Sequence, residues 1–285
     1  MIRSEAKSWP PKGNTKKFYK MILRFKEWLT QDIHISDKQY DYRFRCETLR
    51  EFNRYLKIFI KEPGTVEWIN QNVKNGQTFY DIGANIGVFT ILAASRTGKS
   101  GRVYAFEPHG ANFARLIDNI EINGLQQTVF PNNFALHNQE GFFPFLYKSS
   151  DVGTSDSQLS PSCVASKAEE AHKISELKYS TTIDHLLELG EIKAPHHIKI
   201  DVDGNELLIL EGMRQLLSGT QRPLTLQIEM NDPHKTRIMD LLRITSIASF
   251  INISRNLSPG EKRMAVIRRP LATMQSFVKR ADNFD

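Results

Sequence analysis

Residues 79–89 read FYDIGANIGVF, and this stretch decides the fold class. Its apolar start predicts a buried strand over residues 78–82, followed by a Gly/Asn loop and a helix from about Val88. Gly83 and Gly87 allow a sharp turn and a close approach of a ligand to the backbone. The G-x-x-x-G spacing differs from the G-x-G-x-x-G spacing that places a pyrophosphate on a helix N-terminus. Asp81 would repel a pyrophosphate, so the loop suits a ligand with a positive ammonium group; the alternative is a plain strand–helix turn.

Outward from this loop, strands and helices alternate. We expect strands at residues 78–82, 103–106, 128–130, 197–202 and 224–229, and helices at 89–95, 112–123, 206–217 and near 234–242. This order predicts a parallel sheet with right-handed crossovers. Two last strands, 249–253 and 263–267, flank a turn-rich segment and predict an antiparallel pair. Apolar residues at helical spacing predict covering helices at 18–29, 42–60 and 65–73.

An acid at the end of the second strand points to the ligand. Glu107 follows the strand 103–106, and it lies 24 residues after Gly83. In nucleotide-binding α/β folds an acid about 20 residues beyond the first glycine binds ribose hydroxyls. Together with the loop, Glu107 indicates an adenosine-containing ligand without phosphate, which is S-adenosylmethionine; the alternative is a surface Glu at a strand end.

Three more acids follow the strand that ends near residue 202. Residues 198–206 read IKIDVDGNE, which places Asp201 at the carboxyl end of the strand, where open α/β sheets bind their ligands. Asp203 and Glu206 come within one turn of the next helix, and three neighbouring acids are costly unless they bind a cation or share protons. We expect Asp203 and Glu206 to bind substrate; the alternative is that Asp203 caps the helix and Glu206 decorates its first turn.

These motifs resemble the FkbM family of methyltransferases, from residue 62 to about residue 217. The resemblance is carried by the runs FYDIGANIGVFTILAAS, VYAFEPHGANFARLIDNIEING, NNFALHNQEG, TTIDHLL and IKIDVDGNELLILEGM. It implies a class I methyltransferase fold: a Rossmann-like three-layer α/β sandwich whose seven-stranded, mostly parallel sheet has an antiparallel last strand. The family often has Glu where this chain has Asp203, a change that keeps the charge and shortens the reach.

The same resemblance implies how the cofactor is held. The glycine loop lines the methionine end, Glu107 holds the ribose, Asn133 and Ala135 flank the adenine, and Asp201 lies near the transferred methyl group. The residues expected to bind S-adenosylmethionine are Asp81, Gly83, Ala84, Asn85, Gly87, Glu107, Pro108, Asn133, Ala135 and Asp201.

A hydroxyl acceptor must lose its proton as it attacks, so a base is expected within hydrogen-bond reach. Asp201 is the first candidate and His137 the second, although His137 also fits a loop histidine without a catalytic role. No Cys/His spacing of the zinc type occurs, so we expect no metal. Residues 148–179 are polar and Ser-rich and predict either a lid over the acceptor or an unstructured surface loop.

The composition and the distribution of charge limit the kinds of partner that we expect this protein to bind. The 285 residues carry 38 Lys/Arg against 32 Asp/Glu, but the basic excess lies in residues 1–26 and 261–285, which leaves the remainder mildly acidic. A nucleic-acid groove would place this excess at the active site, so we expect no specific nucleic acid and at most weak contact of the basic N-terminus with an anionic surface. The two cysteines, the missing apolar run of a secretion signal and the lack of a membrane-spanning run predict a cytoplasmic protein.

The resemblance to the FkbM family implies an O-methyltransferase that acts on a hydroxyl of a sugar, a glycan or a secondary metabolite. The first alternative is a nucleic-acid or protein methyltransferase, disfavoured by the absence of an Asn/Asp-Pro-Pro-Tyr/Phe/Trp sequence. The second is a non-catalytic cofactor-binding module, disfavoured by the intact acids. The expected organisation is a basic lead with a helical extension over residues 1–60, a methyltransferase domain over 61–270 and a tail over 271–285.

Overall fold

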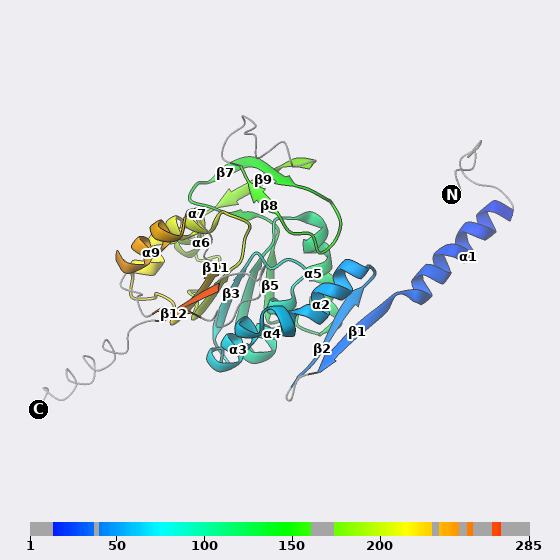
Figure 1. The fold of residues 1–285 in the computed structure, drawn as a ribbon, viewed down its shortest axis with the longest axis horizontal. Helices are drawn as coiled ribbons and strands as arrows, with labels where there is room; N and C mark the ends of the chain where they lie inside the picture. The colour runs from blue at the N-terminus through cyan, green and yellow to red at the C-terminus, as the bar shows by residue number, and fades with distance from the viewer. Residues whose placement is uncertain are drawn as a thin grey trace, which may run out of the picture.

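The computed structural model describes residues 14–36, 40–160, 174–229, 234–244, 250–252 and 264–268. Its centre is a seven-stranded sheet with the order β12-β13-β11-β10-β3-β4-β5 (Figure 1). The strands are β3 (Thr78–Ile82), β4 (Arg102–Phe106), β5 (Val129–Asn132), β10 (His197–Ile200), β11 (Thr225–Glu229), β12 (Phe250–Asn252) and β13 (Met264–Arg268). Strands β5, β4, β3, β10 and β11 pair in parallel, whereas β13 is antiparallel to both β11 and β12. The predicted mostly parallel sheet with an antiparallel last strand is confirmed.

Helices cover both faces of this sheet, which makes three layers. One face is covered by α3 (Pro63–Asn72), α4 (Val88–Thr97) and α5 (Gly110–Ile122), and the other by α7 (Glu206–Glu211), α8 (Arg214–Ser218) and α9 (Lys235–Ile244). Successive residues of a strand point to opposite faces of the sheet. Phe79 therefore packs in the hydrophobic cluster under α3, α4 and α5, and Tyr80 packs in the cluster under α7, α8 and α9.

The helix predicted over residues 206–217 is interrupted. It divides into α7 and α8 at Gly212, where a Cβ atom would collide with the backbone oxygen of His137. This close approach requires a glycine at position 212, and the backbone leaves helical geometry at the next residue, Met213.

A second, four-stranded sheet lies over the carboxyl ends of the central strands. It has the order β6-β9-β7-β8, from β6 (Ala135–Leu136), β7 (Gly141–Tyr147), β8 (Ser157–Leu159) and β9 (Ile174–Thr181), and α6 (Ile183–Glu188) follows it (Figure 1). The sequence analysis predicted no strand between residues 130 and 197. That expectation is wrong for the described residues, because all four strands of this sheet fall in the interval.

The N-terminal part also differs from the prediction. Residues expected to begin a helix at Tyr42 form β2 (Asp41–Cys46), which pairs with β1 (Gln31–Ser36) before α2 (Leu49–Lys61) begins. Tyr42 and Phe44 are buried while Asp41 and Arg43 are exposed, an alternation typical of a strand. A buried ion pair of 2.7 Å between Glu51 and Arg115 ties α2 to α5.

The first helix, α1 (Asn14–Leu29), extends away from this body (Figure 1). Within the described part of the chain, no helix is long and apolar enough to cross a bilayer. The division at residues 60 and 270 stays a prediction, and residues 271–285 lie outside the described ranges.

Candidate active site

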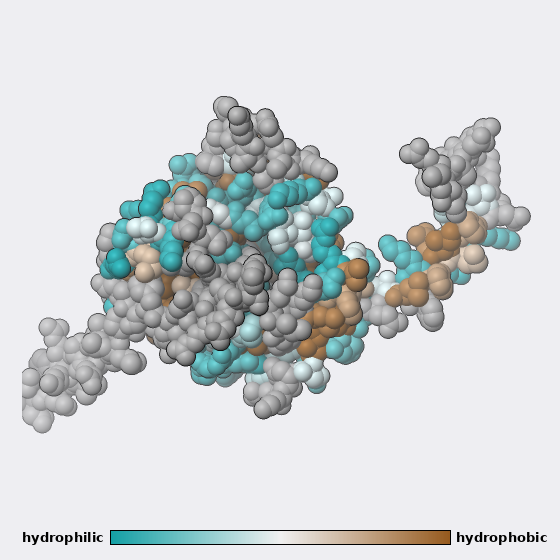
Figure 2. Space-filling model, viewed as in Figure 1, coloured by the Kyte–Doolittle hydropathy of each residue, from teal (hydrophilic) through white to brown (hydrophobic). Residues whose placement is uncertain are grey.

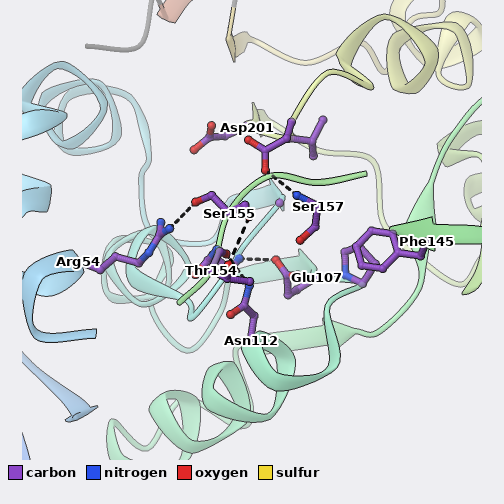
Figure 3. A pocket seen from close by; sticks show the side chains of 13 residues that line it. Arg54, Glu107, Asn112, Phe145, Thr154, Ser155, Ser157 and Asp201 are labelled. Atoms are coloured by element: carbon purple, nitrogen blue, oxygen red, sulfur yellow. Dashed lines mark hydrogen bonds between the residues drawn. The ribbon is translucent and has the colours of Figure 1, made fainter. Parts of the chain in front are cut away.

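Two adjoining cavities lie where β3, β4 and β10 end beneath the second sheet. The polar cavity is a cleft of about 490 Å³, open to solvent, and its lining includes Arg54, Asn85, Glu107, Asn112, Ser155, Asp201 and Asp203 (Figure 3). The apolar cavity, of about 380 Å³, is lined by residues that include Phe106, Phe134, Ala135, Leu136, Phe145, Leu159 and Ile209. Gly83, Pro108, Phe145, Ser157 and Val202 belong to both linings, so the two cavities form one elongated site.

Gly83 allows the loop after β3 to touch the end of β10. Its φ is +80°, and a Cβ atom there would collide with the backbone oxygen of Asp201. The next turn places Asn85 at φ +51°, with its backbone N–H directed at Glu107. The loop predicted to bind the ligand is therefore packed against two of the predicted acids.

Glu107 is 5% exposed and is held from two sides. One carboxylate oxygen accepts the N–H of Asn85 at 2.6 Å, and the other accepts the N–H of His109 at 2.8 Å. Burial raises the pKa of Glu107 to about 7, although these two hydrogen bonds oppose the rise. Each carboxylate oxygen has a second acceptor position, so ionised Glu107 can accept the hydroxyls of a bound sugar ring from the cleft.

Asp81 lines neither of the two cavities, and its expected role in cofactor binding stays a prediction. It is fully buried, accepts the hydroxyl of Thr90 at 2.6 Å and lies 3.7 Å from the Lys199 ammonium. Lys199 is 1% exposed and also pairs with Asp201 at 3.0 Å. The cation beside Asp81 thus comes from the protein itself.

The pKa directions agree with this buried cluster. Burial raises the pKa of Asp81, against the attraction of Lys199. For Lys199, burial lowers the pKa, but Asp201 and Asp81 outweigh it and the net pKa is raised. Lys199 therefore carries its charge, and it links the base of the glycine loop to the acid at the cleft.

A segment that we call the strap, residues 149–159, lies across the polar cavity. The carbonyl of Thr154 accepts the side-chain amides of Asn85 at 2.8 Å and Asn112 at 3.1 Å (Figure 3). Arg54 of α2 donates to the carbonyl of Gly153 and, at 2.6 Å, to the hydroxyl of Ser155. The strap is thus attached to the glycine loop, to α5 and to α2.

Asp203 ties the far end of the strap to β10. It lines the polar cavity, and its carboxylate accepts the N–H groups of Asp156 at 2.5 Å and Ser157 at 3.2 Å. This part of residues 148–179 therefore lines the cleft, its role as a lid stays a prediction, and residues 161–173 lie outside the described ranges.

The other predicted site residues divide into two groups. Pro108 and Ala135 line the cavities. Ala84, Gly87 and Asn133 do not: Gly87 packs against Leu116, and Asn133 donates to the backbone carbonyls of Glu107 and Pro108. Asn133 thus holds the main chain of the residue that carries the buried acid, Glu107.

Glu206 and His137 lie apart from the cleft. Glu206 is 4% exposed, and burial raises its pKa to about 7, but it lines neither cavity. His137 is 1% exposed, its ring packs on Phe143, and burial lowers its pKa. Neither side chain lines the two cavities, and the expected roles of His137 as a base and of Glu206 in substrate binding stay predictions.

Sequence reasoning missed several lining residues. Arg54, Asn112 and Phe145 lie outside the strand ends and the possible lid that it considered. It also missed Lys199, which lines neither cavity but left a signal, because a lysine inside an otherwise apolar strand, HIKI, requires a buried partner. In the described ranges, no group of three His, Cys, Asp or Glu side chains is arranged to hold a metal ion.

A seven-stranded sheet with an inserted antiparallel strand, a glycine loop after its central strand and a buried acid after the next define the class I methyltransferases. Residues 81–252 match the family model described as the methyltransferase FkbM domain. The chain belongs to this family, and the identification made from the motifs is confirmed.

The chain is also similar to individual proteins. Over 210 residues it is 26% identical to the hexuronic acid methyltransferase AglP of Haloferax volcanii, covering 70% of this chain and 78% of that protein. Among solved structures it is similar to the FkbM methyltransferase of Methylobacillus flagellatus KT, with a TM-score of 0.45, 15% identity and coverage of 90% of this chain and 71% of that one. An rRNA methylase of Streptococcus thermophilus gives a TM-score of 0.46 at 10% identity, with coverage of 74% and 98%.

Proposed function

We propose that this protein transfers a methyl group from S-adenosylmethionine to a hydroxyl of a sugar acid. The observation that carries the proposal is Glu107, a buried carboxylate held by two backbone N–H groups at the edge of the cleft. A carboxylate in this position accepts a pair of ribose hydroxyls. The sugar acid is proposed from the relative AglP, which is named a hexuronic acid methyltransferase.

The two cavities fit the two ends of an adenosine cofactor. The apolar cavity, with Phe106, Phe134 and Ala135 in its lining, offers hydrophobic contacts suited to an adenine ring. The polar cavity adjoins it through Gly83 and Pro108 and holds Glu107. We infer that the cofactor spans both cavities, with its ribose at Glu107 and its methionine end toward Asn85 and Asp201.

The reaction needs alignment and removal of one proton. S-adenosylmethionine, when bound, supplies the methyl group. Asp201 lines the polar cavity, and its carboxylate is positioned by Lys199 at 3.0 Å. We propose that Asp201 takes the proton of the acceptor hydroxyl as this oxygen attacks. The strap excludes water above it and orients the acceptor through Ser155 and Ser157, both of which line the same cavity.

Arg54 gives the cleft a cationic group for the carboxylate of the acceptor. Its guanidinium donates to Gly153 and Ser155 of the strap and lines the polar cavity. A guanidinium has five N–H donors and binds carboxylates with a fixed geometry. Arg54 would therefore allow the protein to discriminate uronic acids, which carry a carboxylate, from neutral sugars, which do not.

Replacing Arg54 by Gln should lower kcat/KM for a hexuronic acid glycoside about 10- to 100-fold, because a hydrogen bond to a charged group contributes roughly 1.5–3 kcal/mol. The neutral hexose glycoside of the same structure should change less than about threefold. The ratio of the two kcat/KM values is the measurement. An equal loss for both glycosides would show that Arg54 only holds the strap.

The binding of S-adenosylmethionine should weaken roughly tenfold between pH 8 and pH 6, since ionised Glu107 is the form that accepts the ribose hydroxyls and its pKa is about 7. Calorimetric titration of S-adenosylmethionine and S-adenosylhomocysteine measures this. Glu107→Gln should weaken binding at pH 8 by about tenfold or more and should abolish the pH dependence.

Glu206→Gln is the matched control, because Glu206 has the same raised pKa of about 7 and lines neither cavity. It should leave both affinity and pH dependence unchanged. If wild-type protein bound neither sulfur compound, or if NAD bound in their place, the proposed function would be wrong.

Two further expectations stay predictions. The contact of the basic N-terminus with an anionic surface is supported by the eight Lys/Arg residues against one acid in residues 1–26. The only support for a cytoplasmic location is the small number of cysteines.

A further inference from the structure

The first helix carries a continuous apolar face that is open to solvent. Its members recur three or four residues apart and therefore lie along one side of the helix. They are Phe18 (48% exposed), Met21 (59%), Ile22 (41%), Phe25 (58%) and Leu29 (54%). Figure 2 shows this apolar surface on α1, which Figure 1 shows extending away from the body. Exposed apolar surfaces of this size mark interaction sites.

Basic residues occupy the opposite side of the same helix. Lys16, Lys20 and Arg24 recur every four residues, so they form one row. Lys17 and Lys26 add two more positive charges, and Glu27 is the single acid of α1. All residues from 15 to 27 are exposed. Two further exposed apolar residues, Tyr19 (49%) and Leu23 (56%), lie toward the basic side, so α1 has one apolar side and one mixed side with an excess of positive charge.

We propose that α1 binds in the interface of an anionic bilayer, with its long axis in the membrane plane. The apolar side chains enter the boundary between headgroups and acyl chains, and the lysine and arginine side chains reach up to anionic headgroups. A helix with a large apolar face and a polar face rich in Lys and Arg is typical of interfacial binding. The methyltransferase body then stays in water beside the membrane, connected to α1 through β1.

Charge favours this occupant over a second copy of the chain. Two α1 helices packed through their apolar faces would leave the row of Lys16, Lys20 and Arg24 facing water on the outer sides, where the pairing makes no use of their positive charge. An anionic bilayer instead attracts each Lys and Arg. An acidic protein partner would share the attraction, and the experiment below separates it from lipid because it uses lipid alone.

The test is co-sedimentation of the full chain with vesicles of phosphatidylcholine alone or of phosphatidylcholine with phosphatidylglycerol. Wild-type protein should bind the anionic vesicles about tenfold more strongly than the neutral ones, and salt should weaken this binding. Phe18→Ser/Ile22→Ser should lower binding to anionic vesicles about tenfold or more, since both apolar contacts with the acyl boundary are lost.

Phe142→Ser/Leu177→Ser is the matched control, because these side chains of the second sheet are 69% and 70% exposed and lie outside α1. This control should bind vesicles like wild type. Wild-type protein that bound neither vesicle would overturn the proposal, as would equal loss in both double variants. A wild-type dimer that Phe18→Ser/Ile22→Ser dissociates, without vesicle binding, would assign the face to a second copy. Methyl transfer to a soluble acceptor should be unchanged in both variants and reports that they are folded.

Discussion

Lys199→Met should lower the free energy of unfolding by about 3–5 kcal/mol, because it leaves the fully buried Asp81 without its cation. Urea denaturation at neutral pH measures this loss. Without Lys199, the pKa of Asp81 is raised further above its unfolded value. The deficit should therefore be small in acid, where Asp81 is protonated in both states, and should grow as the pH rises above about 4.

Two variants check the cause of this loss. Lys193→Met replaces an exposed lysine a few residues earlier and should change the unfolding free energy by less than about 0.5 kcal/mol. Adding Asp81→Asn to Lys199→Met removes the buried charge and should recover much of the stability. If the double variant were as unstable as Lys199→Met alone, the loss would come from packing and not from charge.

Asp201→Asn should lower kcat for methyl transfer about 10²- to 10⁴-fold, the range expected for removal of a general base. The amide keeps the size of the side chain and can still accept a hydrogen bond from Lys199, so the fold and the affinity for S-adenosylmethionine should change little. Single-turnover methyl transfer at saturating cofactor and acceptor measures the effect on the chemical step.

Asp203→Asn provides the comparison within the same cleft. Asp203 holds the N–H groups of Asp156 and Ser157, so its replacement should raise KM for the acceptor more than it lowers kcat. Should Asp201→Asn retain kcat within about threefold of wild type, the base must be sought elsewhere.

The central sheet could be predicted from the sequence because its strands are buried on both faces. Such strands appear as short apolar runs, and β3 is buried at all five positions. The second sheet escaped because much of it is polar and exposed: the first six residues of β9 alternate between half-buried and exposed, and two of them, Glu176 and Lys178, are charged. The β1–β2 hairpin escaped because the helical spacing of the apolar residues 49–59 was extended back to Tyr42, although Tyr42 and Phe44 follow the alternation of a strand.

Among the residues of the site, the sequence predicted those that lie at the cleft because they follow the end of a strand. Gly83, Glu107 and Asp201 each follow a central strand, and parallel strands bring their carboxyl ends to one edge. The pairing of Asp81 with Lys199 could not be predicted, because Lys199 is 118 residues away and becomes adjacent only when β3 pairs with β10. Arg54 and the strap reach the cleft from outside the sheet. The sequence patterns that identify strands therefore do not predict their contacts with the cleft.

Gly83 places the loop that is proposed to hold the donor in direct backbone contact with the residue that carries the proposed base. The distance between donor and base is therefore determined by main-chain packing inside the sheet and not by side-chain rotamers. The strap, in contrast, is held by separate side chains of α2, α5 and the glycine loop. Acceptor preference in this protein can thus be re-engineered through the strap and Arg54 while the reacting geometry remains intact.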